Sequence, residues 1–389
     1  MKFVDQLNLK GKKVFIRADL NVPLKDGKVA DDHRIRSAMD TVNYVLSQGA
    51  SVVLASHLGR PKDKPEAAYS LAPVAKRIEE ISDREVIFAP DCVGPEVEAL
   101  AAALQPGQIL LLENLRFHAE ESANDREFSR KLACLAEVYV NDAFGTAHRA
   151  HASTAGMTEF MAEKAGGLTI KSETEYFAKA FENPAHPLVA IMGGAKMETK
   201  IKAIRHVATK ADVILVGGAM ANTFFKAQGY GVGKSLVEDA LLDTAREIIE
   251  EFKSGSCKLV IPVDVVCSET FAAGATTTVR AIDAIGENEM AVDIGPETVK
   301  LFCQYIDSAK TIIWNGPLGA FEITEFSAGT FGVVDALAET SALTVIGGGD
   351  TDLALHQRHA FEKMDYVSTG GGAFLKLLEG KTLPALAVL

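Results

Sequence analysis

The sequence has few cysteines, and none of them lies in a pattern that would build a disulfide scaffold or a zinc finger. The five are Cys92, Cys134, Cys257, Cys267 and Cys303, an odd number without a Cys-x-x-Cys pair. Small secreted domains and zinc modules use paired, closely spaced cysteines. His118, His148 and His151 are also too scattered to make a metal-binding pattern. We therefore expect reduced thiols in a cytoplasmic protein.

Long apolar runs and excess positive charge are missing as well. The start of the chain has no apolar signal core, and no later run is long enough to span a membrane. The 40 Lys and Arg residues are outnumbered by 52 Asp and Glu residues, for a formal net charge of −12. This balance argues against general affinity for nucleic acid. A length of 389 residues, 48% hydrophobic content and 32 glycines favour a protein of two α/β domains.

The first half alternates short apolar runs with amphipathic stretches. Strands are expected at residues 14–16, 50–55, 109–112 and 138–140, and helices at 35–48, 71–81 and 125–136. Such alternation predicts a parallel sheet, whose ligands bind beyond the carboxyl ends of the strands.

Basic residues follow these strands. We expect one edge of the sheet to collect Arg17, Arg34, His57, Arg60, Arg116 and Arg149. Each alone is typical of a surface ion pair, and Arg17 could pair with Asp19. Their recurrence at strand ends instead indicates a site for a small, highly charged anion, because guanidinium groups bind carboxylate and phosphate oxygens in pairs.

In the second half glycine takes the place of arginine after the strands. A helix is expected at 168–181, and six strand-to-helix units should follow. Gly-rich turns come after strands near residues 192, 216, 314, 346 and 369. Glycine lets a backbone come close to a ligand, and exposed N–H groups at a helix start bind phosphate. We expect a nucleotide here, with adenine near Gly217 and Gly218.

Three side chains in these turns suit a nucleotide that carries a metal. Asp350 follows the triple glycine of 347–349 and could hold Mg²⁺. Lys196 and Lys200 are four residues apart, so on a helix they would share a face and could both reach a phosphate chain. Residues 231–235 (GVGKS) end like a Walker A loop, but residue 228 is Gln and no strand precedes them.

An anion site in one domain and a Mg-nucleotide site in the other predict phosphoryl transfer, which needs positioning and charge neutralisation above all. Two alternatives stay open: another ATP-dependent kinase for a small carboxylate, and a non-catalytic two-lobed anion-binding protein. The second would need neither Asp350 nor the paired lysines.

Eight motifs resemble those of phosphoglycerate kinases, in order over the whole chain. In the first half they are residues 17–23 (RADLNVP), 56–61 (SHLGRP), 113–117 (ENLRF) and 141–149 (NDAFGTAHR). In the second half they are 193–196 (GGAK), 314–317 (WNGP), 347–351 (GGGDT) and 368–372 (STGGG).

The resemblance implies reversible transfer of the acyl phosphate of 1,3-bisphosphoglycerate to MgADP, giving 3-phosphoglycerate and MgATP. It implies two doubly wound parallel-sheet domains joined by a helical hinge, with residues 1–170 and 381–389 binding phosphoglycerate and 171–380 binding nucleotide. It also implies a cytoplasmic monomer, with no nucleic-acid or membrane partner.

The resemblance further implies a role for each site residue. Phosphoglycerate would contact Asp19, Asn21, Arg34, His57, Leu58, Gly59, Arg60, Arg116 and Arg149. Catalysis would fall to Arg34, Lys196, Gly371 and Gly372. The nucleotide would contact Lys200, Gly217, Gly218, Ala291, Glu322, Gly348, Gly349, Asp350 and Thr351, with Asp350 on Mg²⁺.

Overall fold

The computed structural model describes residues 1–62 and 64–389. Its chain divides into two compact units, one of Met1–Thr174 with Thr382–Leu389 and one of Glu175–Lys381. Helix α6 (Leu168–Phe177) spans the boundary and continues into a π-helical turn, Ala178–Glu182. In the described part of the chain, no helix has both the length and the apolar character needed to cross a membrane.

The first unit is built on a six-stranded parallel sheet. Its strands, in spatial order, are β5 (Val86–Phe88), β6 (Ile109–Leu111), β4 (Ser51–Ala55), β1 (Lys13–Ala18), β7 (Val138–Asp142) and β8 (Glu163–Gly166). The four strands expected from the sequence are present, and β5 and β8 extend the sheet at its two edges. A small hairpin, β2 (Leu24–Lys25) with β3 (Lys28–Val29), follows β1 along the chain.

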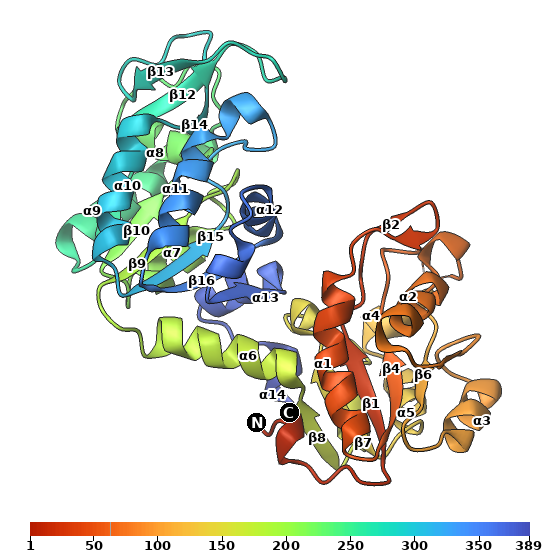
Figure 1. Cartoon of the computed structure of the whole chain (residues 1–389). Coiled ribbons are helices and arrows are strands. Elements are labelled where there is room, and N and C mark those ends of the chain that lie inside the picture. The colour runs from red at the N-terminus through yellow and green to blue at the C-terminus, as the bar shows by residue number, and fades with distance from the viewer. Residues whose placement is uncertain (63) are drawn as a thin grey trace. The chain divides into compact units, whose positions relative to one another are not determined.

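Helices cover both faces of this sheet because side chains alternate along each strand. Val14 and Ile16 pack into one hydrophobic core, whereas Phe15 between them packs into the other. The first core lies under α1 (His33–Ser47) and α2 (Ala72–Ser82), and the second under α3 (Pro95–Ala103) and α5 (Arg126–Ala133) (Figure 1). The short helix α4 (Ala119–Ala123) precedes α5, and α14 (Pro384–Ala387) returns to this unit, where Ala385 N–H donates to Ala147 O.

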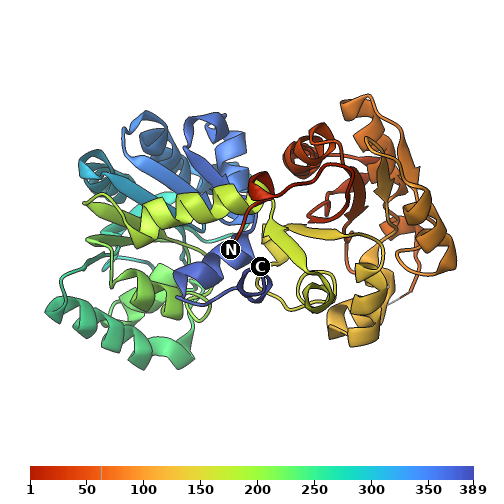
Figure 2. The same cartoon turned by 90° about the horizontal axis from the view of Figure 1, so that it is seen from below.

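The second unit repeats the design. Its parallel sheet runs β11 (Lys258–Val260), β10 (Val213–Val216), β9 (Leu188–Met192), β15 (Thr311–Asn315), β16 (Leu343–Gly347) and β17 (Tyr366–Ser368). Figure 2 shows helices on both sides of it. One side carries α7 (Ile201–Val207), α8 (Met220–Ala227), α9 (Leu242–Ser254) and α13 (Gly371–Leu378), and the other α10 (Pro296–Ser308), α11 (Ala328–Glu339) and α12 (Gly349–Gln357).

A three-stranded antiparallel sheet in the second unit was not expected from the sequence. It consists of β13 (Thr278–Ala281), β12 (Asp264–Ser268) and β14 (Met290–Ile294). Strand β13 has no buried residue, so its sequence lacks the alternation of apolar and polar residues that marks a half-buried strand. The two doubly wound parallel sheets of the predicted fold are nonetheless confirmed.

One buried carboxyl group makes the stability of the second unit depend on pH. Asp293, in β14, accepts hydrogen bonds from Gly329 N–H at 2.6 Å and Thr330 Oγ1 at 3.4 Å. Burial nevertheless raises the pKa of Asp293 to about 7. The folded state therefore holds a proton that the unfolded chain releases between about pH 4 and 7, and folding stability falls as pH rises through this window.

We predict that Asp293→Asn removes part of this pH dependence. Between pH 5 and 8 the wild type should lose about 2–3 kcal/mol of unfolding free energy through this group, and the variant should not. Urea unfolding followed by the fluorescence of Trp314, the single tryptophan and a residue of the same unit, measures the difference. Asp307→Asn, at an exposed site on α10, is the control. Equal pH dependence in wild type and Asp293→Asn would contradict the assignment.

Candidate functional site

Four neighbouring strands of the first sheet bring the predicted anion-binding residues to one edge. Strands β6, β4, β1 and β7 lie side by side and parallel, so their carboxyl ends meet. Asp19 and Asn21 follow β1, residues 57–60 follow β4, Arg116 follows β6, and Arg149 follows β7. This is the edge at which parallel α/β sheets bind ligands.

The loop after β4 is held to its neighbours through Gly59. Its N–H donates to Asn21 Oδ1 at 2.7 Å, and its carbonyl accepts from Arg116 Nη1 at 2.9 Å. Gly59 has φ +62°, and a Cβ there would lie 2.4 Å from the ring of Tyr69. No other residue fits this position without displacing Tyr69, so the loop depends on this glycine.

Arg34 reaches the same edge from the first turn of α1. Its Nη1 donates to Asp19 Oδ2 and to the carbonyl of Asn21, both at 3.2 Å. The Asp19 side chain is 10% exposed, whereas that of Arg34 is 40% exposed. One corner of the guanidinium is thus fixed by protein while much of the group faces solvent.

Arg17 lies beneath this edge and contacts His57. It is fully buried, and its guanidinium donates to Ser153 Oγ at 2.9 Å, to the carbonyl of Ala18 and to His57 Nδ1 at 3.1 Å. Arg17 therefore makes these three contacts in place of the possible pair with Asp19. Its position in strand β1 directs its side chain into the interior.

The contact with Arg17 determines which ring nitrogen of His57 carries the proton. A guanidinium is a donor only, so Nδ1 of His57 accepts and Nε2 carries the proton. Burial, followed by the charges of Arg17 and Arg116, lowers the pKa of His57 well below its usual value. His57 is thus a neutral N–H donor at neutral pH.

Positive charge is concentrated at this edge. Burial first, and then repulsion by Arg17, Arg149 and Arg60, lower the pKa of Arg116 to about 10, against the attraction of Glu121. Burial and the charges of Arg17, Arg116 and Arg149 lower the pKa of His151 to about 4. Such mutual repulsion shows that the predicted basic residues are brought together, and it makes the edge a strong site for an anion.

Residues that hold this edge in place were missed in the sequence. Glu121 is buried and accepts from Ser153 N–H at 2.9 Å and from Ser153 Oγ at 2.6 Å, and Ser153 in turn accepts from Arg17. Asn114 Nδ2 donates to the carbonyls of Leu58 at 2.8 Å and Tyr69 at 2.9 Å. The two residues of each of these hydrogen bonds are 32 or more positions apart in sequence, so no local pattern reveals the pairings.

The second sheet ends in glycine turns that pack backbone against backbone. A Cβ on Gly193 would lie 2.1 Å from Pro317 O, and one on Gly316 would lie 2.3 Å from Gly193 O. A Cβ on Gly218 would lie 2.6 Å from Gly194 N. The turns after β9, β10 and β15 thus form one close-packed group, in which glycine allows one backbone to approach another.

Lys196 and Lys200 do not share a helix face, which corrects the geometry expected from their spacing. Helix α7 begins only at Ile201, and residues 195–200 form a bend and a turn. The carboxylate of Glu238 accepts from the N–H groups of Met197 and Glu198 and fixes this turn. Lys196 is consequently exposed, whereas Lys200 is buried.

Lys200 points toward the ends of the central strands. Its Nζ donates to Asn315 Oδ1, and Asn315 Nδ2 donates to Gly347 O at 2.8 Å. Burial lowers the pKa of Lys200 to about 8, while the charge of Asp350 opposes this shift. Lys200 and Asp350 therefore face the same region of the second unit.

Two helix starts lie together at this region. A Cβ on Gly371, the first residue of α13, would lie 2.8 Å from Gly348 Cα, which caps α12. Gly349 and Asp350 are exposed in the first turn of α12, and the buried Thr351 accepts from Gly316 N–H at 2.9 Å. The first turns of both helices leave N–H groups without helical partners, next to Gly372.

The residues expected around adenine are linked through the loop after β15. Gly217 packs against Leu318, and Gly218 N–H donates to Leu318 O at 2.8 Å. Two residues on, Ala320 N–H donates at 2.9 Å to the carbonyl of Val292, the neighbour of Ala291 in β14. Glu322 is exposed in the next turn.

Comparison with known proteins identifies the family. The sequence model of the family described as phosphoglycerate kinase matches residues 4–381. A phosphoglycerate kinase of Chloroherpeton thalassium is 52% identical, with 100% of this chain and 98% of that protein covered. The cytosolic phosphoglycerate kinase of Triticum aestivum is 50% identical, with 99% and 96% covered.

A comparison with a solved structure indicates the same family. The phosphoglycerate kinase of Coxiella burnetii superposes with a TM-score of 0.91 at 42% identity, over 99% of this chain and 98% of that chain. Sequence and structure agree over the full length, and this chain belongs to the phosphoglycerate kinase family.

Proposed function

We propose that the chain catalyses reversible transfer of the acyl phosphate of 1,3-bisphosphoglycerate to MgADP, giving 3-phosphoglycerate and MgATP. Family membership supports the reaction, and the cluster of mutually repelling basic groups at the edge of the first sheet supports the anionic acceptor. The proposal also takes the protein as a cytoplasmic monomer.

The first unit would bind phosphoglycerate. Arg60, Arg116 and Arg149 would meet phosphate and carboxylate oxygens, and the Nε2–H of neutral His57 would donate a hydrogen bond. Asp19 and Asn21 would contact the ligand. Asp19 also holds Arg34, and Asn21 also holds Gly59, each through a hydrogen bond. Leu58 lies in the same loop, next to Gly59.

The second unit would bind the nucleotide. The amides at the start of α12 and the ammonium of Lys200 would meet the phosphates, with Thr351 supporting the turn. Gly217 and Gly218, which follow β10, and Ala291 would border adenine, and Glu322 would take the ribose hydroxyls. Asp350 has an exposed carboxylate beside the phosphate region and fits a Mg²⁺ ligand, since this ion prefers oxygen. Bound Mg²⁺ would neutralise charge on the phosphates.

During transfer the charge on the moving phosphoryl oxygens would be stabilised by donors held in advance. Arg34, Lys196 and the amides of Gly371 and Gly372 would supply them, and such fixed donors lower the barrier without reorganisation. Direct transfer needs the carboxylate oxygen and the phosphorus to reach bonding distance while water is excluded. The proposal therefore includes closure of the units on each other, with the segment around α6 as hinge.

Trapping the acyl phosphate tests the reaction. We expect the purified protein, MgATP, 3-phosphoglycerate and hydroxylamine to yield a hydroxamate, and to yield none without the acid or the metal. Other small phosphorylated and unphosphorylated carboxylic acids serve as competitors and controls. Absence of hydroxamate in a protein that still binds nucleotide would overturn the proposed acceptor and leave another carboxylate as the substrate.

Arg34→Ala should lower kcat by on the order of 10²-fold or more, as expected for loss of one donor to the transition state. Arg36→Ala is a matched control, because Arg36 lies on the same helix but pairs with Asp32 instead of Asp19. Steady-state kinetics of both variants measure the effect. A rise in KM at unchanged kcat for Arg34→Ala would mean that Arg34 binds substrate only.

Asp350→Ala should act through the metal. The Mg²⁺ concentration needed for half-maximal activity should rise by roughly tenfold or more, since a carboxylate ligand is lost. Asp352→Ala, two residues further along α12, should leave it nearly unchanged. A normal Mg²⁺ titration in Asp350→Ala would show that this carboxylate does not hold the metal.

A further inference from the structure

Asp91, Cys92 and His118 form a cluster that takes no part in the proposed reaction. Asp91 and Cys92 lie in the loop after β5, and His118 follows the 3-10 helix η3 (Leu115–Phe117) after β6. Strands β5 and β6 are neighbours in the sheet, so the loops after them meet. The grouping is invisible in the sequence because 26 positions separate Cys92 from His118.

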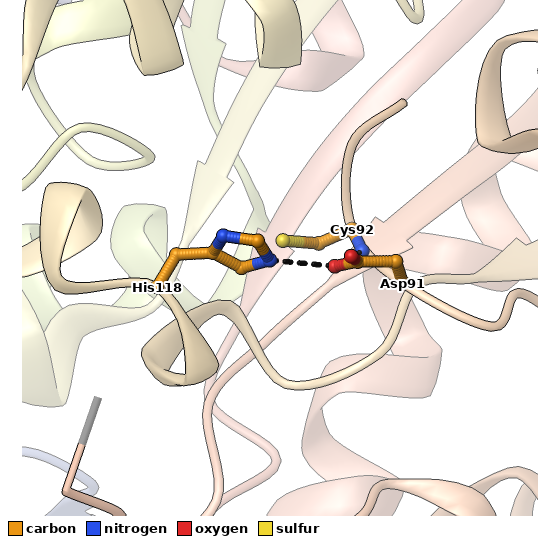
Figure 3. Close-up of side chains that lie close together, drawn as sticks. All are labelled: Asp91, Cys92 and His118. Atoms are coloured by element: carbon orange, nitrogen blue, oxygen red, sulfur yellow. Dashed lines mark hydrogen bonds and ion pairs between the residues drawn. The ribbon is translucent and has the colours of Figure 1, made fainter. Parts of the chain in front are cut away.

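The three side chains point toward one another (Figure 3). His118 Nε2 and Asp91 Oδ1 are 2.6 Å apart, and the sulfur of Cys92 lies beside them. A carboxylate oxygen, the thiol sulfur and the imidazole nitrogen all lie within 4.8 Å of one another. Ligands of a tetrahedral zinc ion, at bond lengths of about 2.0–2.3 Å, stand roughly 3.3–3.8 Å apart. Small side-chain rotations would therefore bring the three donors into range.

The donor set selects a class of ion. One sulfur, one nitrogen and one oxygen suit Zn²⁺, whereas Mg²⁺ and Ca²⁺ prefer oxygen alone. A divalent ion bound to one thiolate and one carboxylate makes a site of zero net charge, which limits the cost of burying Cys92. The ring of His118 packs on Phe128 with centroids 5.3 Å apart, which restricts the orientation of its ligand nitrogen.

The cluster is also accessible. Cys92 is fully buried, but the side chains of Asp91 and His118 are 46% and 28% exposed. An ion could reach the thiol from the side of these two residues, and three protein ligands would leave a fourth position for water.

We propose that Asp91, Cys92 and His118 bind a zinc-class divalent cation at the edge of the first sheet, separately from the Mg²⁺ of the nucleotide. Zinc would replace the proton shared by His118 and Asp91 and the proton of the Cys92 thiol.

Cobalt provides the first test. The full chain, freed of metal by chelation, should bind one equivalent of Co²⁺ with a thiolate-to-cobalt charge-transfer band, and added Zn²⁺ should abolish the band. Cys92→Ser should remove it. Cys134→Ser, which changes an exposed cysteine of the same unit, should keep it. A band that survives in Cys92→Ser, or no band in the wild type, overturns the proposal.

Zinc affinity, measured by competition with a chromophoric chelator, provides the second test. This test does not need Cys92→Ser to fold, because it uses variants of the other two residues. Asp91→Asn and His118→Gln change partly exposed groups, and each should weaken zinc binding by at least ~10²-fold, since even loss of an outer partner costs 10–100-fold. His186→Gln, which removes a histidine paired with Asp212 in the other unit, is the control. Wild-type affinity in both cluster variants would place the zinc elsewhere and refute the site.

Discussion

Repulsion between guanidinium groups is the constraint around which the first unit is arranged. Burial and then the charges of Arg17, Arg149 and Arg60 lower the pKa of Arg116, so these four guanidinium groups lie close enough to repel one another. The fold holds them with fixed acceptors such as Ser153 for Arg17 and the carbonyl of Gly59 for Arg116. The buried carboxylate of Glu121 provides a countercharge to this group. An anionic ligand would relieve the repulsion. The same repulsion lowers the folding stability of the first unit when no ligand is bound, so ligand affinity comes at a cost in stability.

In the proposed function the second unit would meet a different anion by different means. Its glycine turns bring helix starts together, and the donors are backbone N–H groups whose direction the helices fix. The one buried cation, Lys200, has its pKa lowered to about 8 by burial. A phosphate chain would favour the charged form of Lys200 and so take up a proton on binding at alkaline pH.

The central strands and the residues that follow them could be predicted from the sequence, because buried parallel strands are apolar runs that end in polar or glycine-rich turns. Edge strand β8 (Glu163–Gly166) has two charged residues in four positions and gave no such signal. The spacing of Lys196 and Lys200 suggested a shared helix face, but Gly194 has φ +121° and Glu238 fixes the next turn from 40 residues away. A period of four is informative only inside a helix.

The residues that orient the site were beyond prediction for a related reason. Arg17 depends on Ser153, 136 positions away, and Ser153 depends on Glu121. A ligand-binding residue of this fold stands at a predictable place, just after a strand. The residues that hold its side chain in position can come from any segment that packs beneath it. The same reasoning applies to η3, which carries Arg116 and is followed by His118. The contact of His118 with Asp91 ties the end of this turn to the loop after β5, and no motif contains that pair.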